Sequence, residues 1–471
     1  MRTTTVLRLP VFGLLLISLA VARCQAGTTG RIDRFVRMEM ERQHIPGLAI
    51  GVLKAGKVIV AKGYGYADIE HRVPAGPETI FHAASVGKQF TAVAVMLLVE
   101  DGKLALDESI TRYLTSAPPA WKPITVRHLL THTSGLPDYA SAIDFRRDYT
   151  EDELAKIFYR LRPRFPAGAR WSYSNTGYAL LGIIIHTVSG RFWGDFLRER
   201  VFEPLGMDTA RVVADDEIVP NRAASYRLTD AGLRAQDIVA PRWSTTADGG
   251  VSLSVLDLIT WARTLRAGTL LDRGSWAQVF EPVRLRSGHH FPYGFGWYLD
   301  TAAGQPVRRH CGDWRGFRLC LADYPASDLT VMVLTNLGKA LPSLLVQGIV
   351  AIVEPTLTRD PAPMPDTEPE VTLRLRTLLV SPREGHAHPG DLPEGFSPFF
   401  PGDMQGYQES APLLRRLGSP GRLDLAARRE FGDDVLYVYL ARYPHATLEV
   451  ALGLTPDGKV SHFSLREMNA Q

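Results

Sequence analysis

Ser85 and Lys88 form the first pattern in this sequence that suggests chemistry. The segment Ser85-Val86-Gly87-Lys88 opens a run with helical character, and residues three apart in a helix lie on the same face. Lys88 would therefore lie beside the Ser85 hydroxyl. The first turn of a helix also leaves backbone N–H groups unpaired and favours developing negative charge. The pattern predicts a nucleophile, a cation and an oxyanion donor together, although serine is also a common helix cap and lysine a common surface residue.

A second polar group, Tyr173-Ser174-Asn175, lies further along the chain. A tyrosine has a pKa of about 10, so it needs a positively charged neighbour to act as a base near neutral pH. Lys88 is the candidate for that neighbour. The alternative interpretation is a polar loop that caps a helix beginning near Thr176.

The third group, His310-Cys311-Gly312, ends a predicted strand. A glycine at such a position lets a ligand approach the backbone closely. The N–H group of the following residue, Asp313, is then a candidate second donor to an oxyanion. A histidine two residues before a glycine has no functional meaning alone, so the prediction depends on the combination of the three groups.

In this order, the three groups resemble the motifs of the serine β-lactamase and penicillin-binding protein superfamily. They match its class C-like branch, in which the second motif is Tyr-x-Asn and the third is His-x-Gly. That branch includes D-alanyl-D-alanine carboxypeptidases, D-aminopeptidases and esterases. The resemblance covers roughly residues 30–353, and similar runs occur in the segments 125–137, 202–208, 249–251, 257–258 and 293–297.

The resemblance implies that Ser85 attacks a carbonyl carbon and forms an acyl-enzyme. Tyr173, held partly ionised beside Lys88, would take the serine proton and later activate water. Whether Tyr173 or Lys88 is the base stays open, because a strongly coupled pair titrates together.

Four further residues receive binding roles from the same resemblance. The backbone N–H groups of Ser85 and Asp313 would stabilise the oxyanion, by about 3–4 kcal/mol per donor as in other hydrolases. Gly312 would allow the close approach that this contact needs. Asn175 would bind substrate or orient Lys88. His310 would line the floor of the pocket.

The first residue of the third motif bears on substrate choice. Class C β-lactamases carry lysine there, whereas His310 is mostly neutral at pH 7 and cannot hold a substrate carboxylate as firmly. Asp313 adds negative charge nearby, which Arg315 could offset. We therefore expect at most weak β-lactamase activity and a preference for esters, D-amino-acid amides or peptides, including peptidoglycan-derived ones. The alternative is a catalytically silent penicillin-binding-like protein that acts as a cell-wall binding or regulatory module.

Other functional classes are disfavoured. A net charge of +3 over 471 residues, without a block of basic residues, argues against nucleic-acid binding. No Gly-x-Ser-x-Gly or His-Glu-x-x-His motif occurs. His128 and His132 have metal-ligand spacing but no third ligand nearby, and the pairs His289/His290 and His386/His388 are interpreted as exposed loop residues. We expect neither a metal nor a cofactor.

The N-terminus predicts export. Arg2 and Arg8 precede an apolar run of roughly a dozen residues that ends in Ala20-Val21-Ala22, which is typical of a signal peptide over residues 1–22. A membrane-spanning helix needs about 20 residues, so we expect no span after cleavage, with an uncleaved anchor as the alternative. The protein would then be secreted or periplasmic.

Three cysteines are too few to hold a fold of this size together. Lipidation of Cys24 is disfavoured because the preceding Arg23 is bulky. Cys311 and Cys320 flank a predicted turn, and they would be either a disulfide across a hairpin or two buried thiols. The sequence leaves this choice open, as it does the oligomeric state.

The elements that must position these groups alternate between strands and helices. Strands are expected over 48–53, 58–66, 293–299, 305–312, 317–323 and 329–334. Helices are expected over 85–100, 125–132, 150–160, 176–189, 255–266 and 343–353. This order predicts an α+β fold, in which an antiparallel sheet flanked by helices carries an all-helical insertion, as in the β-lactamase/transpeptidase fold, over residues 27–354.

A separate region is expected at the C-terminus. Five prolines in 355–369 predict a stiff linker. Residues 370–471 are predicted to form a small α+β domain, with a helix over 371–380 and strands over 435–440, 447–454 and 460–465. It resembles modules of the cystatin or NTF2 type and is interpreted as a lid, a dimerisation module or a cell-wall-binding module.

Overall fold

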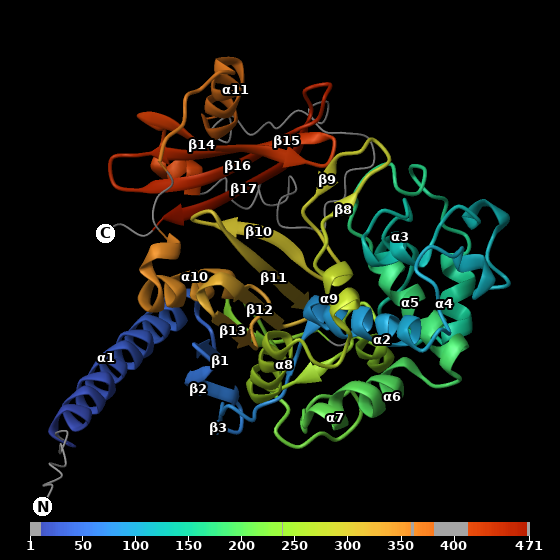
Figure 1. Cartoon of the computed structure of the whole chain (residues 1–471), viewed down its shortest axis with the longest axis horizontal. Coiled ribbons are helices and arrows are strands. Elements are labelled where there is room, and N and C mark those ends of the chain that lie inside the picture. The colour runs from blue at the N-terminus through green and yellow to red at the C-terminus, as the bar shows by residue number, and fades with distance from the viewer. Residues whose placement is uncertain (1–10, 238, 359–361, 381–412, 469–471) are drawn as a thin grey trace, which may run out of the picture.

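The computed structural model describes residues 11–237, 239–358, 362–380 and 413–468. Its centre is a seven-stranded antiparallel sheet in the order β10-β11-β12-β13-β1-β2-β3 (Figure 1). The first strand of the chain pairs with β13, the last strand of this region, as the predicted fold requires. The strands are β1 (Gly47–Lys54), β2 (Lys57–Asp68), β3 (Val73–Pro74), β10 (Tyr298–Ala302), β11 (Gln305–Trp314), β12 (Phe317–Tyr324) and β13 (Leu329–Thr335).

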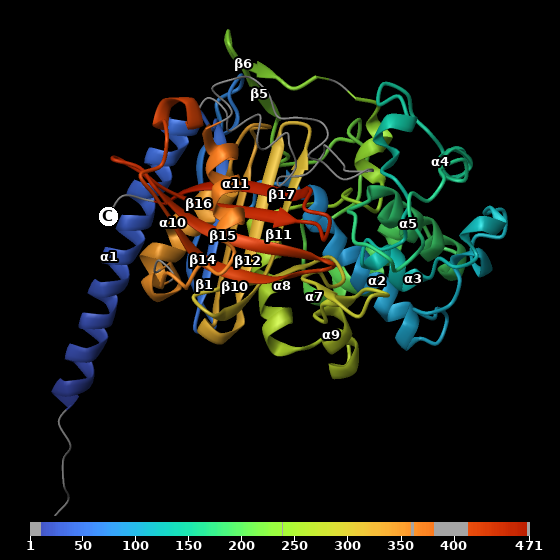
Figure 2. The same cartoon turned by 90° about the horizontal axis from the view of Figure 1, so that it is seen from above.

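The middle of the sheet is buried on both faces, which explains its continuous apolar strands. Along β13, Val331 and Val333 belong to one core cluster, whereas Met332 and Leu334 belong to the other. Two helices, α1 (Val11–Gln43) and α10 (Pro342–Val353), cover the first face. On the opposite side lie α2 (Lys88–Glu100) and α8 (Val255–Ala267), and Figure 2 shows the sheet between the two layers.

The helical insertion lies beside the second layer of helices (Figure 1). The helix that begins at Glu151 starts at a reciprocal cap between Thr150 and Glu153. The helices of the insertion are α3 (Val126–Leu130), α4 (Glu151–Phe158), α5 (Asn175–Ser189), α6 (Trp193–Leu197) and α7 (Glu203–Leu205). Helix α9 (Arg273–Val279) lies next to them. Three small two-stranded sheets pair β4 (Phe81–His82) with β7 (Ser252–Leu253), β5 (Tyr226–Thr229) with β6 (Gly232–Ala235), and β8 (Val283–Arg284) with β9 (His290–Phe291).

Two predicted elements differ from the structure here, and one strand was missed. The helix expected over 125–132 ends at Leu130, because His132 has a left-handed backbone with φ of 57°. The strand expected over 293–299 begins only at Tyr298, since Gly296 has φ of 78° and the chain turns before it. A fourth C-terminal strand, β14 (Arg422–Phe431), was not predicted, because charged residues obscure its alternation.

The C-terminal region forms a second antiparallel sheet in the order β14-β15-β16-β17, above the β10 edge of the main sheet in Figure 1. Helix α11 (Pro369–Val380) packs on it and contributes Leu375 and Leu379 to a core of its own. The other strands are β15 (Asp434–Arg442), β16 (Thr447–Leu454) and β17 (Val460–Met468). The Pro-, Gly- and His-rich segment 381–412, with His386 and His388, lies outside the described residues.

At the other end of the chain, α1 is continuous from Val11, and its N-terminal half extends away from the rest of the molecule (Figure 1). The expected signal peptide covers residues 1–10, outside the described residues, and the start of this helix. Among the helices of the described residues, none combines the length and apolar character that crossing a membrane requires.

Candidate active site

Ser85 lies in a short 3-10 helix, Ala84–Gly87, rather than in the α-helix that was expected to begin there. The α-helix α2 begins at Lys88. The preceding residue, Ala84, has φ of 49°, a conformation that is unfavourable for a residue with a Cβ atom and is often found at functional sites. Its N–H group donates to Nδ1 of His82 at 3.1 Å. This turn therefore holds Ser85 in a fixed, strained bend immediately before the N-terminus of α2.

Lys88 is fully buried beneath this turn. Its Nζ atom donates hydrogen bonds to Oγ of Ser85 at 3.0 Å, to Oδ1 of Asn175 at 2.8 Å and to the backbone carbonyl of Asp248. Burial lowers the pKa of Lys88 to about 8, although the carboxylates of Asp248 and Asp138 oppose this decrease. A substantial fraction of Lys88 is therefore neutral at mildly alkaline pH.

Tyr173 is buried next to this lysine, whose Nζ atom lies 4.9 Å from the centroid of the phenol ring. Burial raises the pKa of Tyr173 well above its usual value, the neighbouring phenol of Tyr298 raises it further, and a hydrogen bond with Ser85 opposes the increase. The structure does not agree with a partly ionised Tyr173, because desolvation outweighs any stabilisation of the phenolate. Of the two residues, Lys88 is the one with a pKa suited to a base.

Asn175 is the first residue of α5, where its N–H group donates to Oδ2 of Asp138 at 3.0 Å. Its side-chain oxygen accepts from Lys88. Of the two roles expected for Asn175, the structure therefore shows the contact that orients the lysine.

Strand β11 brings the third motif against the serine turn. A Cβ atom on Gly312 would lie 2.6 Å from the carbonyl oxygen of Ala83 and 2.9 Å from the backbone nitrogen of Ser85, so only glycine permits this approach. Asp313 follows it in the strand. The carboxylate of Asp313 pairs with Arg318 at 2.8 Å, so a cation other than the expected Arg315 offsets its charge.

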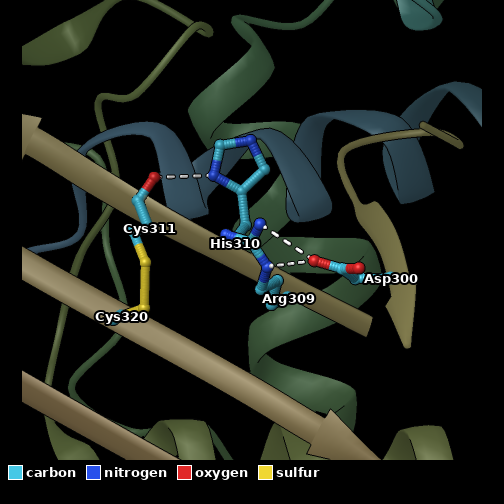
Figure 3. Close-up of a disulfide and its surroundings, with 5 residues drawn as sticks. All are labelled: Asp300, Arg309, His310, Cys311 and Cys320. Carbon is cyan, nitrogen blue, oxygen red and sulfur yellow. Dashed lines mark hydrogen bonds and ion pairs between the residues drawn. A yellow bond between two sulfur atoms is a disulfide. The ribbon is translucent and has the colours of Figure 1, made fainter. Parts of the chain in front are cut away.

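His310 is buried in the same strand and lines the pocket. Its Nδ1 atom lies 2.7 Å from the carbonyl oxygen of Cys311, while Arg309 pairs with Asp300 (Figure 3). Burial lowers the pKa of His310 to about 3, so the ring is neutral at pH 7, in line with the expectation that it carries no fixed charge. The neighbouring Cys311 forms a disulfide with Cys320 on β12, which resolves the alternatives left open by the sequence.

Two carboxylates in the pocket were not predicted as site residues. Asp248 is 8% exposed, and its Oδ2 atom accepts a hydrogen bond from the hydroxyl of Tyr139 at 3.0 Å. Asp138 also lines the pocket, as does Asp248. Both residues directly adjoin runs that resemble the family, namely 125–137 and 249–251. Position next to those runs was the only signal in the sequence that could have identified them.

The two histidines with metal-ligand spacing do not share a site. His128 caps α3, where its Nδ1 atom accepts from the N–H group of Thr125 at 3.1 Å. His132 points elsewhere and contacts Tyr293 and Tyr173. His132 thus packs against a predicted site residue, Tyr173, and sequence reasoning missed this contact.

A cavity of about 2760 Å³ connects this site to the C-terminal sheet. Its walls include Ser85 and His310 on one side and the turn between β14 and β15 on the other. Phe431 of that turn lies 4.4 Å from Phe291, measured between ring centroids. The preceding residues, His289 and His290, are exposed as predicted, and both contact Glu430; His290 lies in β9 rather than in a loop.

Comparisons with known proteins fit this geometry. A family model described as Beta-lactamase matches residues 32–348. Penicillin-binding protein 4* of Bacillus subtilis (strain 168) is 29% identical over 333 residues, which are 66% of this chain and 72% of that protein. A D-aminopeptidase of Gluconobacter oxydans (strain 621H) is 29% identical over 299 residues, which are 62% of this chain. The chain spans only 56% of the length of that D-aminopeptidase.

Solved structures of similar proteins share this fold. The D-amino acid amidase from Ochrobactrum anthropi SV3, complexed with L-phenylalanine amide, has a TM-score of 0.61 and 26% identity, and the match covers 70% of this chain and 97% of that one. An octameric penicillin-binding protein homologue from Pyrococcus abyssi has the same TM-score at 24% identity, and the match covers 93% of this chain and 94% of that one. The second likeness extends the shared fold into the C-terminal region.

Proposed function

This chain belongs to the Beta-lactamase family and is a serine hydrolase, and from that premise we propose that it cleaves amides of D-amino acids through an acyl-enzyme on Ser85. The observation that carries the proposal is the contact of 3.0 Å between Nζ of the buried Lys88 and Oγ of Ser85. A neutral lysine at this distance can take the serine proton as the hydroxyl oxygen attacks.

The surrounding acceptors support Lys88 as the base. A neutral lysine retains two N–H bonds, which the side chain of Asn175 and the backbone carbonyl of Asp248 can accept. Its lone pair then faces the Ser85 hydroxyl. Oγ of Ser85 bonds to the substrate carbonyl carbon while the proton moves to Lys88.

Breakdown of the tetrahedral intermediate needs a proton for the leaving amine. Tyr173 is suited to this step because its raised pKa keeps the phenol protonated. The phenol gives its proton to the amine as the C–N bond breaks, and it regains a proton from Lys88. Water then attacks the acyl-enzyme by the same route, and the acid leaves Ser85.

The oxyanion would be held by the backbone N–H groups of Ser85 and Asp313, as in other acyl-transfer enzymes. The close packing of Gly312 against the serine turn supports this role, since it places the strand carrying Asp313 next to the nucleophile. The strained turn at Ala84 serves the same end, because it fixes the direction of the Ser85 backbone.

The charges of the inner pocket support a substrate with a free amine. The third motif supplies a neutral His310, and two carboxylates, Asp138 and Asp248, line the same cavity. An ammonium group is attracted to such carboxylates, whereas a β-lactam carboxylate finds no lysine in the third motif. A solved relative is named as a D-amino acid amidase, which agrees in substrate class. Esters of the same acyl groups are expected substrates as well, and β-lactams poor ones.

Intact-mass spectrometry and rate measurements on a matched panel test this proposal. The panel contains D-phenylalanine amide, its L-enantiomer, the N-acetylated D-amide, a D-phenylalanine ester and nitrocefin. We expect the free-amine D-substrates to be hydrolysed at least about tenfold faster than the N-acetylated one, since one charged contact is lost. Nitrocefin turnover above that of the D-amides would overturn the assignment. Stable acylation by β-lactams without turnover of any substrate would instead support the silent binding protein.

We propose that the hydrolase acts outside the cytoplasm after removal of residues 1–22. The basic residues and apolar run at the N-terminus support this proposal. N-terminal sequencing of protein recovered from the medium or periplasm should start at Arg23. Full-length protein confined to the cytoplasm would contradict it.

We also assign the C-terminal region, beyond the linker at 355–369, to the pocket as a lid. Between ring centroids, Phe431 lies 4.4 Å from Phe291, which stacks on Trp171 at 4.0 Å, and Trp171 lies 6.3 Å from Tyr173. Gly432 donates its N–H group to the carbonyl of His290 at 2.9 Å. Among the three roles considered for this region, these contacts favour the lid.

A further inference from the structure

Three buried side chains connect the second motif to the third, and we call them the His132–Tyr293–His310 chain. The Nε2 atom of His132 lies 3.1 Å from Oη of Tyr293, and that Oη lies 3.3 Å from Nε2 of His310. At one end the N–H group of Ser174 donates to Nδ1 of His132 at 3.1 Å. At the other end Nδ1 of His310 meets the carbonyl oxygen of Cys311 (Figure 3). None of the three rings is more than 2% exposed.

The two ends determine the direction of every bond between them. A carbonyl oxygen only accepts, so Nδ1 of His310 must carry a proton. The Ser174 N–H group only donates, so Nδ1 of His132 carries none, and its proton is on Nε2. Burial lowers the pKa of both histidines well below the usual value, and both rings are neutral. His132 therefore donates to Tyr293, and Tyr293 donates to His310.

His132 also holds the candidate catalytic tyrosine directly. Its ring stacks on that of Tyr173, with centroids 4.0 Å apart and an interplanar angle of 26°. Its partner Ser174 follows Tyr173 in the sequence, so one imidazole contacts both the phenol ring and the next peptide group. The backbone of His132 at this position is left-handed, with φ of 57°.

The charged and titratable groups that face the chain leave this assignment intact. Lys88 acts on both histidines and Arg309 on His310, and each positive charge disfavours an imidazolium. Burial raises the pKa of Tyr293 well above its usual value, and the neighbouring Tyr178, Tyr173 and Tyr298 raise it further, so the hydroxyl keeps its proton. Tyr178 donates its own proton to the carbonyl of Leu130 and is also a hydrogen-bond partner of Tyr293, so the Tyr293 hydroxyl is shared between Tyr178 and His310.

We propose that His132 and Tyr293 are positioning residues, which keep Tyr173 and His310 each in a single orientation. They do so through hydrogen bonds that all run in one direction, because the two histidines are opposite tautomers. Both nitrogens of His310 are thereby occupied, so His310 is not a ligand for substrate but holds β11 beside the serine turn. The proposal rests on the proposed function only where it gives Tyr173 a part in proton transfer.

Nitrogen-15 NMR of the histidine-labelled wild-type protein tests the tautomers without any substrate. We expect His132 to be protonated on Nε2 and His310 on Nδ1, and neither to titrate between about pH 5 and 8. Variants His132→Gln and His310→Gln serve only to assign the two sets of signals. Identical tautomers, or titration of either ring in that range, would overturn the proposal. Failure of Ser85 to form an acyl-enzyme would contradict the proposed function but would leave the tautomers of the two histidines unchanged.

Tyr293→Phe tests the positioning role, because it removes one hydroxyl and leaves the ring. We expect kcat to fall on the order of tenfold with KM changed less than about twofold, since the reacting groups are displaced while the pocket remains. Tyr64→Phe is the matched control: that hydroxyl is also buried and bonds Asp33 at 2.6 Å, but in the other core cluster. Equal loss of stability in both variants with kcat retained in Tyr293→Phe would show a merely structural role.

Discussion

The Nζ atom of Lys88 and the Oγ atom of Ser85 are 3.0 Å apart, and no part of the lysine side chain reaches solvent. Burial makes the ammonium less favourable, and the hydrogen bonds of Lys88 keep it directed at the serine. The same residue is thereby both weakly basic and fixed in position. This relationship leads to several expectations that can be measured.

Replacement of Ser85 by alanine removes the proposed nucleophile and little else. We expect loss of labelling by a fluorophosphonate or fluorescent penicillin probe, and a fall in kcat on the order of a thousandfold or more. The thermal midpoint should stay close to that of the wild type. A variant that still labels would show that the nucleophile is misassigned.

The pH dependence of kcat/KM should follow Lys88. Because the base must be neutral, the rate should rise with pH and level off above a pKa of about 8. The Asp248→Asn variant removes a carboxylate that raises the pKa of Lys88, so the rising limb should move to lower pH. Asp107→Asn, which alters an exposed carboxylate on the surface, is the control, and the rising limb of its pH profile should not shift. A limb that moves to higher pH in Asp248→Asn would contradict the role of Lys88 as base.

Lys88→Met should abolish activity and yet increase stability at neutral pH. Burial depresses the pKa of Lys88 in the folded state from 10.5 to about 8, so the wild type loses stability as the pH falls from 10.5 to about 8, and the loss is complete below that range. Above about pH 10 that loss disappears. The stability advantage of the variant in urea unfolding should therefore be larger at about pH 7 than at about pH 10. An equal advantage at both values would mean that the pKa of Lys88 is not depressed.

Gly312→Ala should disrupt the site with little effect elsewhere. The added Cβ atom would meet the Ala83 carbonyl oxygen at 2.6 Å, which forces β11 away from the serine turn. We expect kcat to fall on the order of a hundredfold, as for a displacement of about 1 Å in other enzymes. Gly421→Ala, whose nearest atom would be 3.8 Å away, is the control. Unchanged kcat in Gly312→Ala would remove the support for an oxyanion donor on β11.

Phe431→Ala tests the lid. Removing this ring opens the wall next to Phe291, so KM for peptide amides should rise several-fold more than KM for a small amide. Leu373→Ala, in the same C-terminal region but 66% exposed, should change neither value. A Phe431→Ala protein with wild-type kinetics toward both substrates would point to one of the other roles for this region.

Much of the fold followed from local patterns. The buried strands β1 and β13 are continuous apolar runs, and α4 and α8 begin at capping boxes that the sequence displays. The strand predicted over residues 293–297 was wrong because aromatic residues alternate with glycine there as they do in a strand, whereas these residues form a turn in the structure. Strand β14 was missed because its outward positions carry charges, and its pairing with β15 comes from residues beyond a tight turn.

The sequence by itself determined which side chains are available for chemistry, since Ser85, Lys88, Tyr173 and the third motif are recognisable by type and order. Tertiary structure decided how they are used. A pKa depends on burial and on charges near in space, and the groups that act on Lys88 come from Asp248 and Asp138, far from it along the chain. For the same reason the proposals that Lys88 rather than Tyr173 is the base, and that His132 and Tyr293 are positioning residues, depend on contacts that only the folded chain makes.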